Sequence, residues 1–308
     1  MTGGDAAKDA PTHGAARRPW FGVAIVIFAA MGFALSVMLA RVVYRSGGSP
    51  ASIIGVRLTT VFIALSLYCW LTKTSVRLPP RVRGTALALG VLIAFQTLSI
   101  YASFKYIPVS LSVLIEYFYP LLVAIAMRLV AGEPLTAVKI GCIGTAVLGL
   151  TLILKVSFDD LDAYGIFLAG LSAAALTVII TTSNQLLRGI DSLRLMLHMQ
   201  GAGAVASLTV FSITGDLVLP TTPEGLAAVF AIPLFNGSAL FAVFTAIGMI
   251  GATKVSLSLT SEPIFVVALA VIFLGETLVF TQAVGAILIV GAIFVMQLWG
   301  APRAGAAR

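Results

Sequence analysis

Apolar segments about as long as a bilayer is thick recur along the whole chain, and they constrain the fold more than any other feature. A helix needs about 20 mostly apolar residues to cross a membrane, and ten such segments can be drawn in the 308 residues. They are roughly Trp20–Val43, Ser52–Leu71, Thr85–Phe104, Val109–Val130, Thr136–Val156, Tyr164–Leu187, Leu193–Ile213, Leu226–Ile247, Thr253–Leu274 and Thr281–Trp299. The sequence therefore predicts an all-α integral membrane protein with ten transmembrane helices.

The composition agrees with a bilayer as the natural solvent. Only 10% of the residues are charged and 59% are hydrophobic, whereas soluble domains keep about 25% charged residues. A formal net charge of +7 would suggest nucleic acid as a partner of a soluble protein. Here the Lys and Arg residues lie in short segments between apolar runs, which is typical of topology signals. The sequence therefore favours membrane lipid as a partner and argues against nucleic acid.

The distribution of cations predicts which way the chain crosses the membrane. With the N-terminus in the cytoplasm, fourteen of the 19 Lys and Arg residues fall in inner segments and four in outer segments, with Arg57 inside the second span. This bias agrees with the positive-inside rule. Both termini are then cytoplasmic, with a disordered tail over residues 1–19 and a short tail over 301–308. We expect the protein in the plasma membrane, specifically a bacterial inner membrane.

An internal repeat relates the two halves of the chain. A single offset of 143 positions aligns Pro120 with Pro263 and the pair Gly132-Glu133 with Gly275-Glu276. The first copy ends span four and the second ends span nine, so each copy holds five spans. Because five is odd, the two copies must lie upside down relative to each other in the membrane. Inverted repeats are a recurring device of secondary transporters, which bind substrate near the midplane between the halves.

The repeated motifs also resemble a known family. The stretch from Tyr106 through Gly132-Glu133-Pro134-Leu135 is similar to the first half of an EamA-type permease of the drug/metabolite transporter superfamily, and Gly251 through Leu278 is similar to the second half. The resemblance implies two inverted five-helix repeats, which we place at residues 20–157 and 163–300. It also implies a central cavity lined by spans one, three, four, six, eight and nine, through which small organic metabolites move, usually outward.

Two carboxyl groups inside predicted spans are the sharpest candidates for a functional site. A carboxyl group in hydrocarbon is costly, so Glu116 in span four should face a cavity, carry a partner or hold a proton. Helical spacing places Ser112, Tyr119 and Pro120 on the same side as Glu116. Glu262 aligns with Tyr119 under the repeat offset, so Glu262 and Ser258 should face the same cavity from span nine. Alternatively, Glu116 is protonated and only forms a hydrogen bond to a neighbouring helix, and Glu262 only helps to satisfy the backbone that Pro263 leaves open.

Other polar and kink-forming residues complete the candidate site. Gln96 in span three and Asn236 in span eight could line the cavity or join helices to one another. Pro120 and Pro263 should loosen two related helices at similar depth, either as gating hinges or as plain packing kinks. Arg57 either reaches the outer interface or pairs with a cavity carboxylate.

The sequence predicts a transporter rather than an enzyme. It contains no phosphate-binding Walker loop, and the acidic cluster at residues 159–162 has no second cluster with which to build a two-metal site. We expect no metal and no cofactor. The leading interpretation is an exporter of small metabolites such as amino acids, with a coupling proton as a candidate partner. An uptake permease for a nutrient or nucleotide-like metabolite is the alternative, and a membrane-embedded transferase is a more distant one.

Small residues in spans five and ten raise the question of a homodimer. Gly141, Gly144 and Gly149 lie in span five, and Gly285 and Gly291 lie in span ten. Small side chains let two membrane helices approach closely. Packing inside one chain and packing between two copies both need such residues, so the sequence leaves the oligomeric state open.

Overall fold

The computed structural model describes residues 19–155, 162–275 and 277–299. The predicted tails lie outside these residues, apart from Pro19. Three of the four residues of the acidic cluster, and Glu276, also lie outside them. Asp162, the last residue of that cluster, caps a helix: its carboxylate accepts from the backbone N–H groups of Tyr164 and Gly165 at 2.7 and 3.2 Å.

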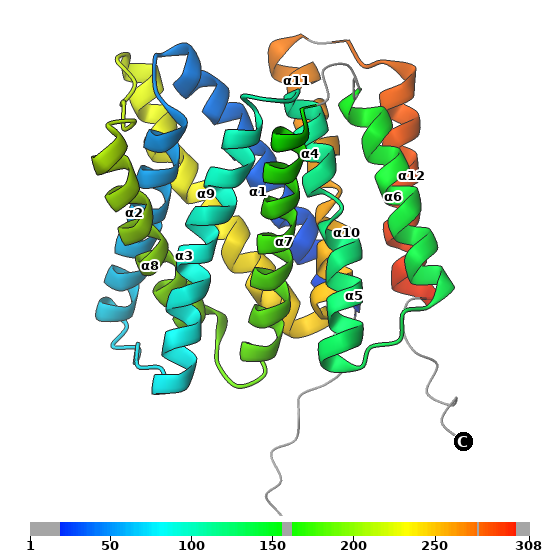
Figure 1. Cartoon of the computed structure of the whole chain (residues 1–308), viewed down its shortest axis with the longest axis horizontal. Coiled ribbons are helices and arrows are strands. Elements are labelled where there is room, and N and C mark those ends of the chain that lie inside the picture. The colour runs from blue at the N-terminus through cyan, green and yellow to red at the C-terminus, as the bar shows by residue number, and fades with distance from the viewer. Residues whose placement is uncertain (1–18, 156–161, 276, 300–308) are drawn as a thin grey trace, which may run out of the picture.

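The described residues form helices and no strands. In chain order the helices are α1 (Pro19–Arg45), α2 (Pro50–Leu71), α3 (Pro80–Ser103), α4 (Val109–Glu116), α5 (Tyr119–Ala131), α6 (Ala137–Leu154), α7 (Ala163–Leu186), α8 (Ser192–Thr214), α9 (Pro223–Ile250), α10 (Ala252–Leu259), α11 (Glu262–Leu274) and α12 (Phe280–Trp299) (Figure 1). Polar side chains mark the starts of several of them. Ser49, Thr136, Asp191 and Thr222 each accept a hydrogen bond from a backbone N–H three residues on, as helix caps do.

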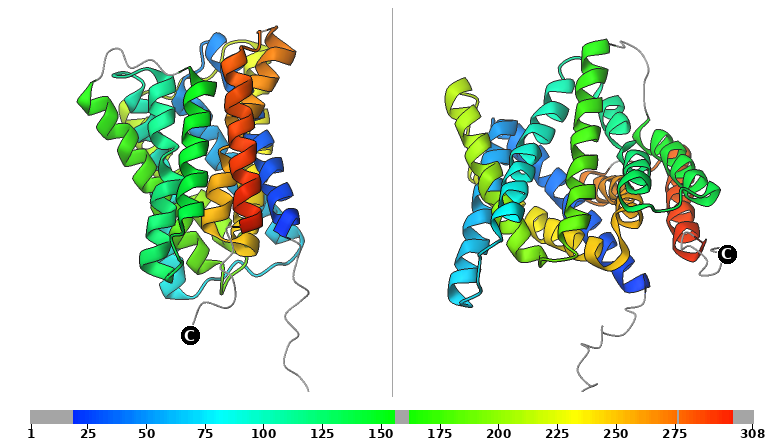
Figure 2. Two further views of the ribbon diagram at one scale, coloured as in Figure 1. Left: turned by 90° about the vertical axis from the view of Figure 1, so that its right-hand side faces the viewer. Right: turned by 60° about the horizontal axis from the view of Figure 1, so that its bottom comes forward.

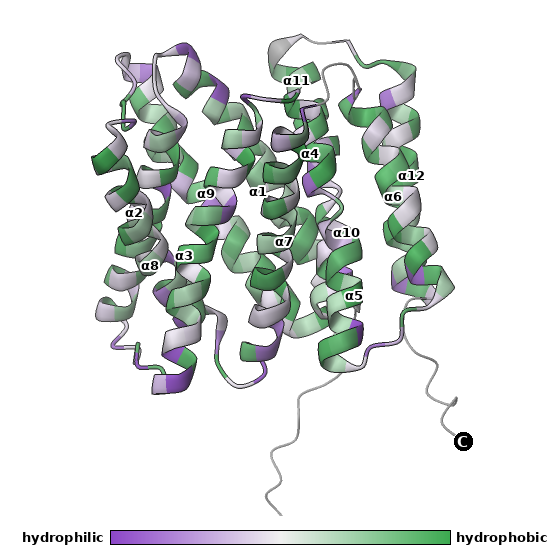
Figure 3. Ribbon diagram, viewed as in Figure 1, coloured by the Kyte–Doolittle hydropathy of each residue, from purple (hydrophilic) through white to green (hydrophobic). Residues whose placement is uncertain are grey.

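Ten segments of the described chain are long and apolar enough to cross a membrane. Eight are single helices, while α4 with α5 and α10 with α11 each make one broken span. Large apolar side chains such as Leu129, which is 80% exposed, cover the outside of the bundle. Apolar residues dominate its middle and polar residues gather at its two ends (Figure 3). The predicted integral membrane protein with ten spans is confirmed.

The offset of 143 positions extends far beyond the two motifs that revealed it. Adding 143 to the bounds of α4 and α5 gives the bounds of α10 and α11 without any adjustment. The other helices match their counterparts with shifts at their ends only. The two copies also run in opposite senses, since α4 lies above α5 while α11 lies above α10 in Figure 1. The fold therefore consists of two inverted five-helix repeats, as predicted.

The helices of the two repeats are interleaved and pack directly against one another, so the repeats do not form two separate bundles. α1 lies along α9, α2 along α8 and α9, and α3 along α7 and α8. Each of these contacts joins one half of the chain to the other. The last helices of the two repeats, α6 and α12, pair at one side of the bundle (Figure 2). The surface between the repeats therefore runs through the centre of the molecule.

Two glycines allow the close approach of α6 and α12. A Cβ atom on Gly149 would lie 2.6 Å from the carbonyl oxygen of Gly285, and one on Gly285 would lie 2.5 Å from that of Gly149. The other glycines of interest behave differently, because a Cβ atom on Gly141, Gly144 or Gly291 would meet nothing within 4 Å. Of the two kinds of packing that the sequence left open, the contact within the chain involves one glycine from each helix, and the other three take no part in it.

Replacing Gly149 by Ala should destabilise the protein, because the added methyl group would push α6 away from the backbone of α12. Overpacking of this kind costs about 1–3 kcal/mol. Gly144→Ala in the same helix is the matched control. It changes the helix propensity by the same amount, and its added Cβ atom has no neighbouring atom within 4 Å. Thermal unfolding in detergent should show a lower midpoint for Gly149→Ala only. Equal midpoints for the two variants would contradict this account of the contact.

Candidate functional site

Both broken spans are interrupted immediately before a proline. α4 ends at Glu116 and α5 begins at Tyr119, while α10 ends at Leu259 and α11 begins at Glu262. Proline has no N–H, so Pro120 cannot donate to the carbonyl of Glu116, four residues earlier. Pro263 stands in the same relation to Leu259. The two prolines, singled out in the sequence as kink or gating residues, thus place both carboxyl groups beside helix breaks.

A cavity of about 340 Å³ lies between the repeats at the level of these breaks. Its walls come from α1–α5 and α7–α11, and α6 and α12 do not contribute. The expected lining by spans one, three, four, six, eight and nine is therefore incomplete. Span two adds Arg57, and span seven adds Gln200. The polar lining residues are Ser36, Arg57, Gln96, Thr97, Tyr101, Glu116, Tyr117, Tyr119, Gln200, Asn236 and Glu262.

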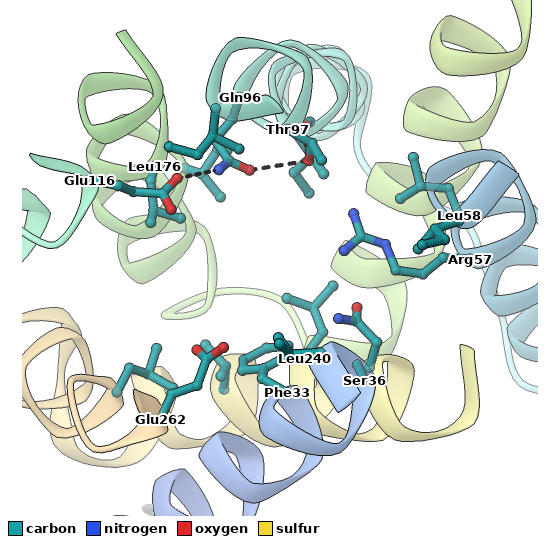
Figure 4. A pocket seen from close by; sticks show the side chains of 18 of the residues that line it. Phe33, Ser36, Arg57, Leu58, Gln96, Thr97, Glu116, Leu176, Leu240 and Glu262 are labelled. Carbon is teal, nitrogen blue, oxygen red and sulfur yellow. Dashed lines mark hydrogen bonds between the residues drawn. The ribbon is translucent and has the colours of Figure 1, made fainter. Parts of the chain in front are cut away.

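Glu116 is held by side chains from two other helices. The Nε2 of Gln96 donates to its Oε1 at 2.7 Å (Figure 4). The Oγ of Ser172 donates to the same oxygen at 2.5 Å. Thr97 in turn donates to the Oε1 of Gln96 at 3.2 Å. The carboxyl group therefore joins α3, α4 and α7 at one wall of the cavity. Nothing in the sequence pointed to Ser172, which reaches Glu116 only through the packing of α7.

Glu262 is held from the other half of the chain. The hydroxyl of Tyr117, in the break between α4 and α5, donates to its Oε2 at 3.1 Å. Tyr119 donates to the carbonyl of Ser256 at 3.0 Å, and its ring lies 6.1 Å from that of Tyr117. Each bond crosses from the first repeat to the second. The breaks thus contact each other through tyrosines, and only Tyr119 of the two was singled out in the sequence.

Arg57 projects into the cavity from the opposite side (Figure 4). Its Nε is buried and has no hydrogen-bond partner in the part of the chain that the structure describes. Of the two positions that the sequence left open, interface or cavity, the structure places the side chain at the cavity.

Two residues singled out in the sequence lie away from the cavity lining. Ser112 and Ser258 are both fully buried, and neither hydroxyl oxygen has a partner among the described residues. Each projects between packed helices instead. Gln96, Glu116, Tyr119, Asn236 and Glu262 are brought together around the cavity. No group of three or more potential metal ligands occurs among residues 19–155, 162–275 and 277–299.

The cavity walls are close to symmetric in shape and asymmetric in charge. Many lining positions pair under the 143-residue offset: Arg57 with Gln200, Ile93 with Asn236, Thr97 with Leu240, Glu116 with Leu259, and Tyr119 with Glu262. In each pair at most one residue is ionisable as an acid or base near neutral pH. The repeat therefore explains the position of the cavity, and divergence between the copies explains its polarity.

The repeat architecture agrees with the comparison to known families. The model of the EamA-like transporter family matches residues 20–155 and 163–298, one match for each repeat. The chain belongs to the EamA-like transporter family. This EamA-like protein is accordingly an integral membrane transporter of small solutes, in contact with lipid around its apolar surface.

A solved structure supports the fold of this EamA-like transporter independently. A chain described only as the crystal structure of a protein superposes with a TM-score of 0.76 over 91% of this chain and 97% of its own. The two are 18% identical in sequence, so the similarity concerns the fold. No protein with a curated description matches the chain.

Cysteine labelling should separate cavity-lining residues of this EamA-like transporter from buried ones. Cys69 and Cys142 are free and buried, and they would first be replaced by Ala. Asn236→Cys should then react with a water-soluble maleimide, because this position lines the cavity. Ser258→Cys, which is fully buried, should stay unlabelled in the folded protein. Comparable labelling rates for the two thiols would contradict the assigned cavity walls.

Proposed function

We propose that this EamA-like transporter is a secondary carrier, working as an exporter of small organic metabolites such as amino acids or related amphipathic solutes. The observation that carries the proposal is the central cavity with three charged side chains, Arg57, Glu116 and Glu262, in its walls. Ionisable residues inside a membrane protein characteristically mark a substrate or ion pathway. A volume of about 340 Å³ lies at the small end of ligand sites, which span about 300–1,000 Å³.

The inverted repeats support alternating access to this cavity. On the side of the bundle opposite the start of α1, the lining reaches Ile53 and Tyr101. Ile53 lies three residues after the start of α2, and Tyr101 lies two residues before the end of α3. Toward the other end the lining stops at Phe244, six residues before the end of α9. Exchange of the conformations of the two halves would open the cavity on the other side. With the termini in the cytoplasm of a bacterial cell, the present conformation would face outward.

The helix breaks are the proposed hinges of this motion. Pro120 and Pro263 remove one hydrogen bond from each ladder, so α5 and α11 can tilt against α4 and α10 at low cost. The bonds from Tyr117 to Glu262 and from Tyr119 to Ser256 connect one hinge to the other. Movement at one break would therefore be felt at its symmetry mate.

Glu116 is the proposed site of a coupling proton, because its partners suit both states of the carboxyl group. The Ser172 hydroxyl has a single hydrogen and lies 2.5 Å from Glu116 Oε1 and 3.2 Å from the backbone oxygen of Gln96. When Glu116 is ionised, Ser172 donates to it. When Glu116 is protonated, it can donate to Ser172, which then donates to Gln96. Neither state leaves a donor without an acceptor.

The direction of transport, the oligomeric state and an enzymatic alternative each relate to a specific feature of the chain. An uptake permease would use the same cavity, because the direction of transport is set by gradients. The glycines Gly141, Gly144 and Gly291, which face away from the α6–α12 contact, are the proposed surface for a homodimer. A transferase enzyme has no support from a metal-binding acidic cluster within the described residues.

Transport in proteoliposomes tests the proposal and the role of Glu116 together. A screen of metabolites would be run with and without a pH gradient to find solutes that the wild-type protein moves. Glu116→Gln keeps the shape of the side chain but cannot carry a proton. We expect it to lose the acceleration by a pH gradient while retaining exchange of solute. Glu224→Gln, at an exposed position in the first turn of α9, should behave as wild type.

Two results would contradict these assignments. Acceleration by the pH gradient that persists unchanged in Glu116→Gln would remove Glu116 as the proton site. Failure of the wild-type protein to move any solute in the screen, in either direction, would count against the carrier itself.

A further inference from the structure

Arg57 is a partly buried cation that faces the cavity without a carboxylate of its own. None of the ion pairs of the described residues includes it, and its Nε–H is buried without an acceptor. A buried charge without a partner costs several kcal/mol, so a protein rarely keeps one unless a partner arrives from outside. A guanidinium group is suited to that task, because its planar fork matches the two oxygens of a carboxylate. The structure therefore places an unfilled anion-binding group in the wall of the cavity.

The carboxyl groups form a separate pole on the other side of the same cavity. Figure 4 shows Glu116 and Glu262 on facing walls toward one side of the cavity, and Arg57 across the open space toward the other side. The helices that carry these groups have different neighbours, since α2 packs on α8 and α9 whereas α11 packs on α1 and α6. No ion pair joins Arg57 to either carboxyl group in the described chain. The cavity is thus polar at two ends rather than neutralised by an internal bond.

The two carboxyl groups differ in how fully they are already bonded. Glu116 accepts from both Gln96 and Ser172, and its proposed role is to hold a proton. Glu262 accepts from the hydroxyl of Tyr117 only, among the described residues. A positively charged group of a solute would therefore find its best partner at Glu262. With Glu116 protonated, the charges of Arg57 and Glu262 sum to zero, so the cavity suits a solute with no net charge.

Apolar side chains form part of the wall between the two poles, together with the polar Ser36 and Thr97. Phe33 and Leu240 are drawn between Arg57 and Glu262 in Figure 4, and Ile179 also belongs to the lining. The side chains of Phe33, Leu240 and Ile179 offer no hydrogen bond to a polar group that passes them. They suit a hydrocarbon stretch that connects two charged ends.

We infer that the cavity binds dipolar solutes whose anionic and cationic groups are separated by several bonds, with Arg57 binding the anionic group and Glu262 the cationic one. An ω-amino carboxylate is a solute of this kind. In a simple α-amino acid, the ammonium and carboxylate groups are attached to the same carbon atom, so such a solute can satisfy one pole only. This inference rests on the proposed function, because it assigns the substrate class of the same cavity.

Isomeric probes test the inference without any change of composition or net charge. Leucine and ε-aminocaproate have the same formula and differ in the separation of their charges, while caproate and hexylamine each carry one charge. Binding of the four compounds to the purified full-length protein would be measured by calorimetry. We expect ε-aminocaproate to bind about tenfold more tightly than each of the other three, as hydrogen bonds to one additional charged group would give.

Variants of Arg57 assign the anionic pole. Arg57→Gln places at this position the residue that its repeat counterpart, Gln200, already has at the cavity. The variant should bind ε-aminocaproate about as weakly as it binds hexylamine, while hexylamine itself should bind as to wild type, because one charged hydrogen-bond partner is lost. If Arg57 had a purely structural role, the variant would bind both compounds more weakly than wild type. The control is Arg45→Gln, an exposed cation at the end of α1, which should keep the wild-type preference.

Several outcomes would overturn the inference while leaving the proposed function intact. Leucine that binds as tightly as ε-aminocaproate would show that charge separation is not recognised. A preference for ε-aminocaproate that survives in Arg57→Gln, or an absence of binding by both zwitterions, would remove Arg57 as the anion site. A different measurement tests the proposed function. That function would be contradicted if a solute binds to the protein and yet is not transported across a proteoliposome membrane.

Discussion

The cost of placing a charged group away from water is the constraint on which the rest of this structure depends. A chain with ten apolar spans offers few places where Arg57, Glu116 and Glu262 could be tolerated, and all three lie around one cavity between the repeats. Glu116 and Glu262 accept hydrogen bonds from side chains of other segments, whereas the Nε–H of Arg57 has no acceptor among the described residues. The cavity is therefore a polar centre that the apolar bundle is built to enclose.

The inverted repeat explains how a chain of this size makes such a centre. Two copies of one five-helix unit produce two helix breaks related by 143 positions, and the breaks meet at the cavity through Tyr117 and Tyr119. A fully symmetric cavity would carry each charge twice. The two copies differ at these positions: Leu259 is the repeat counterpart of Glu116, and Gln200 is that of Arg57. Shape thus comes from duplication, and chemical selectivity comes from the differences between the copies.

Periodic and local features of the sequence were enough to predict the fold. Span length, the positive-inside bias and the Pro and Gly-Glu motifs predicted ten spans in two inverted repeats, because each depends on hydrophobicity or on backbone chemistry within one segment. The site was predicted less completely. Glu116 and Glu262 were found because intramembrane carboxyl groups are costly, but Ser172 and Tyr117 reach them only through contacts between distant helices. Ser112 has helical spacing in common with Glu116, yet it is fully buried away from the cavity lining.

The central claim is that a single cavity is reached alternately from the two sides of the membrane. Counterflow tests it most directly. Proteoliposomes would be preloaded with an unlabelled solute that binds the cavity and then diluted into a trace of the same solute carrying a label. The account predicts a transient accumulation of label inside the vesicles, because inward and outward movements share one binding site. Label that only equilibrates, at a rate unaffected by the preloaded solute, would contradict it.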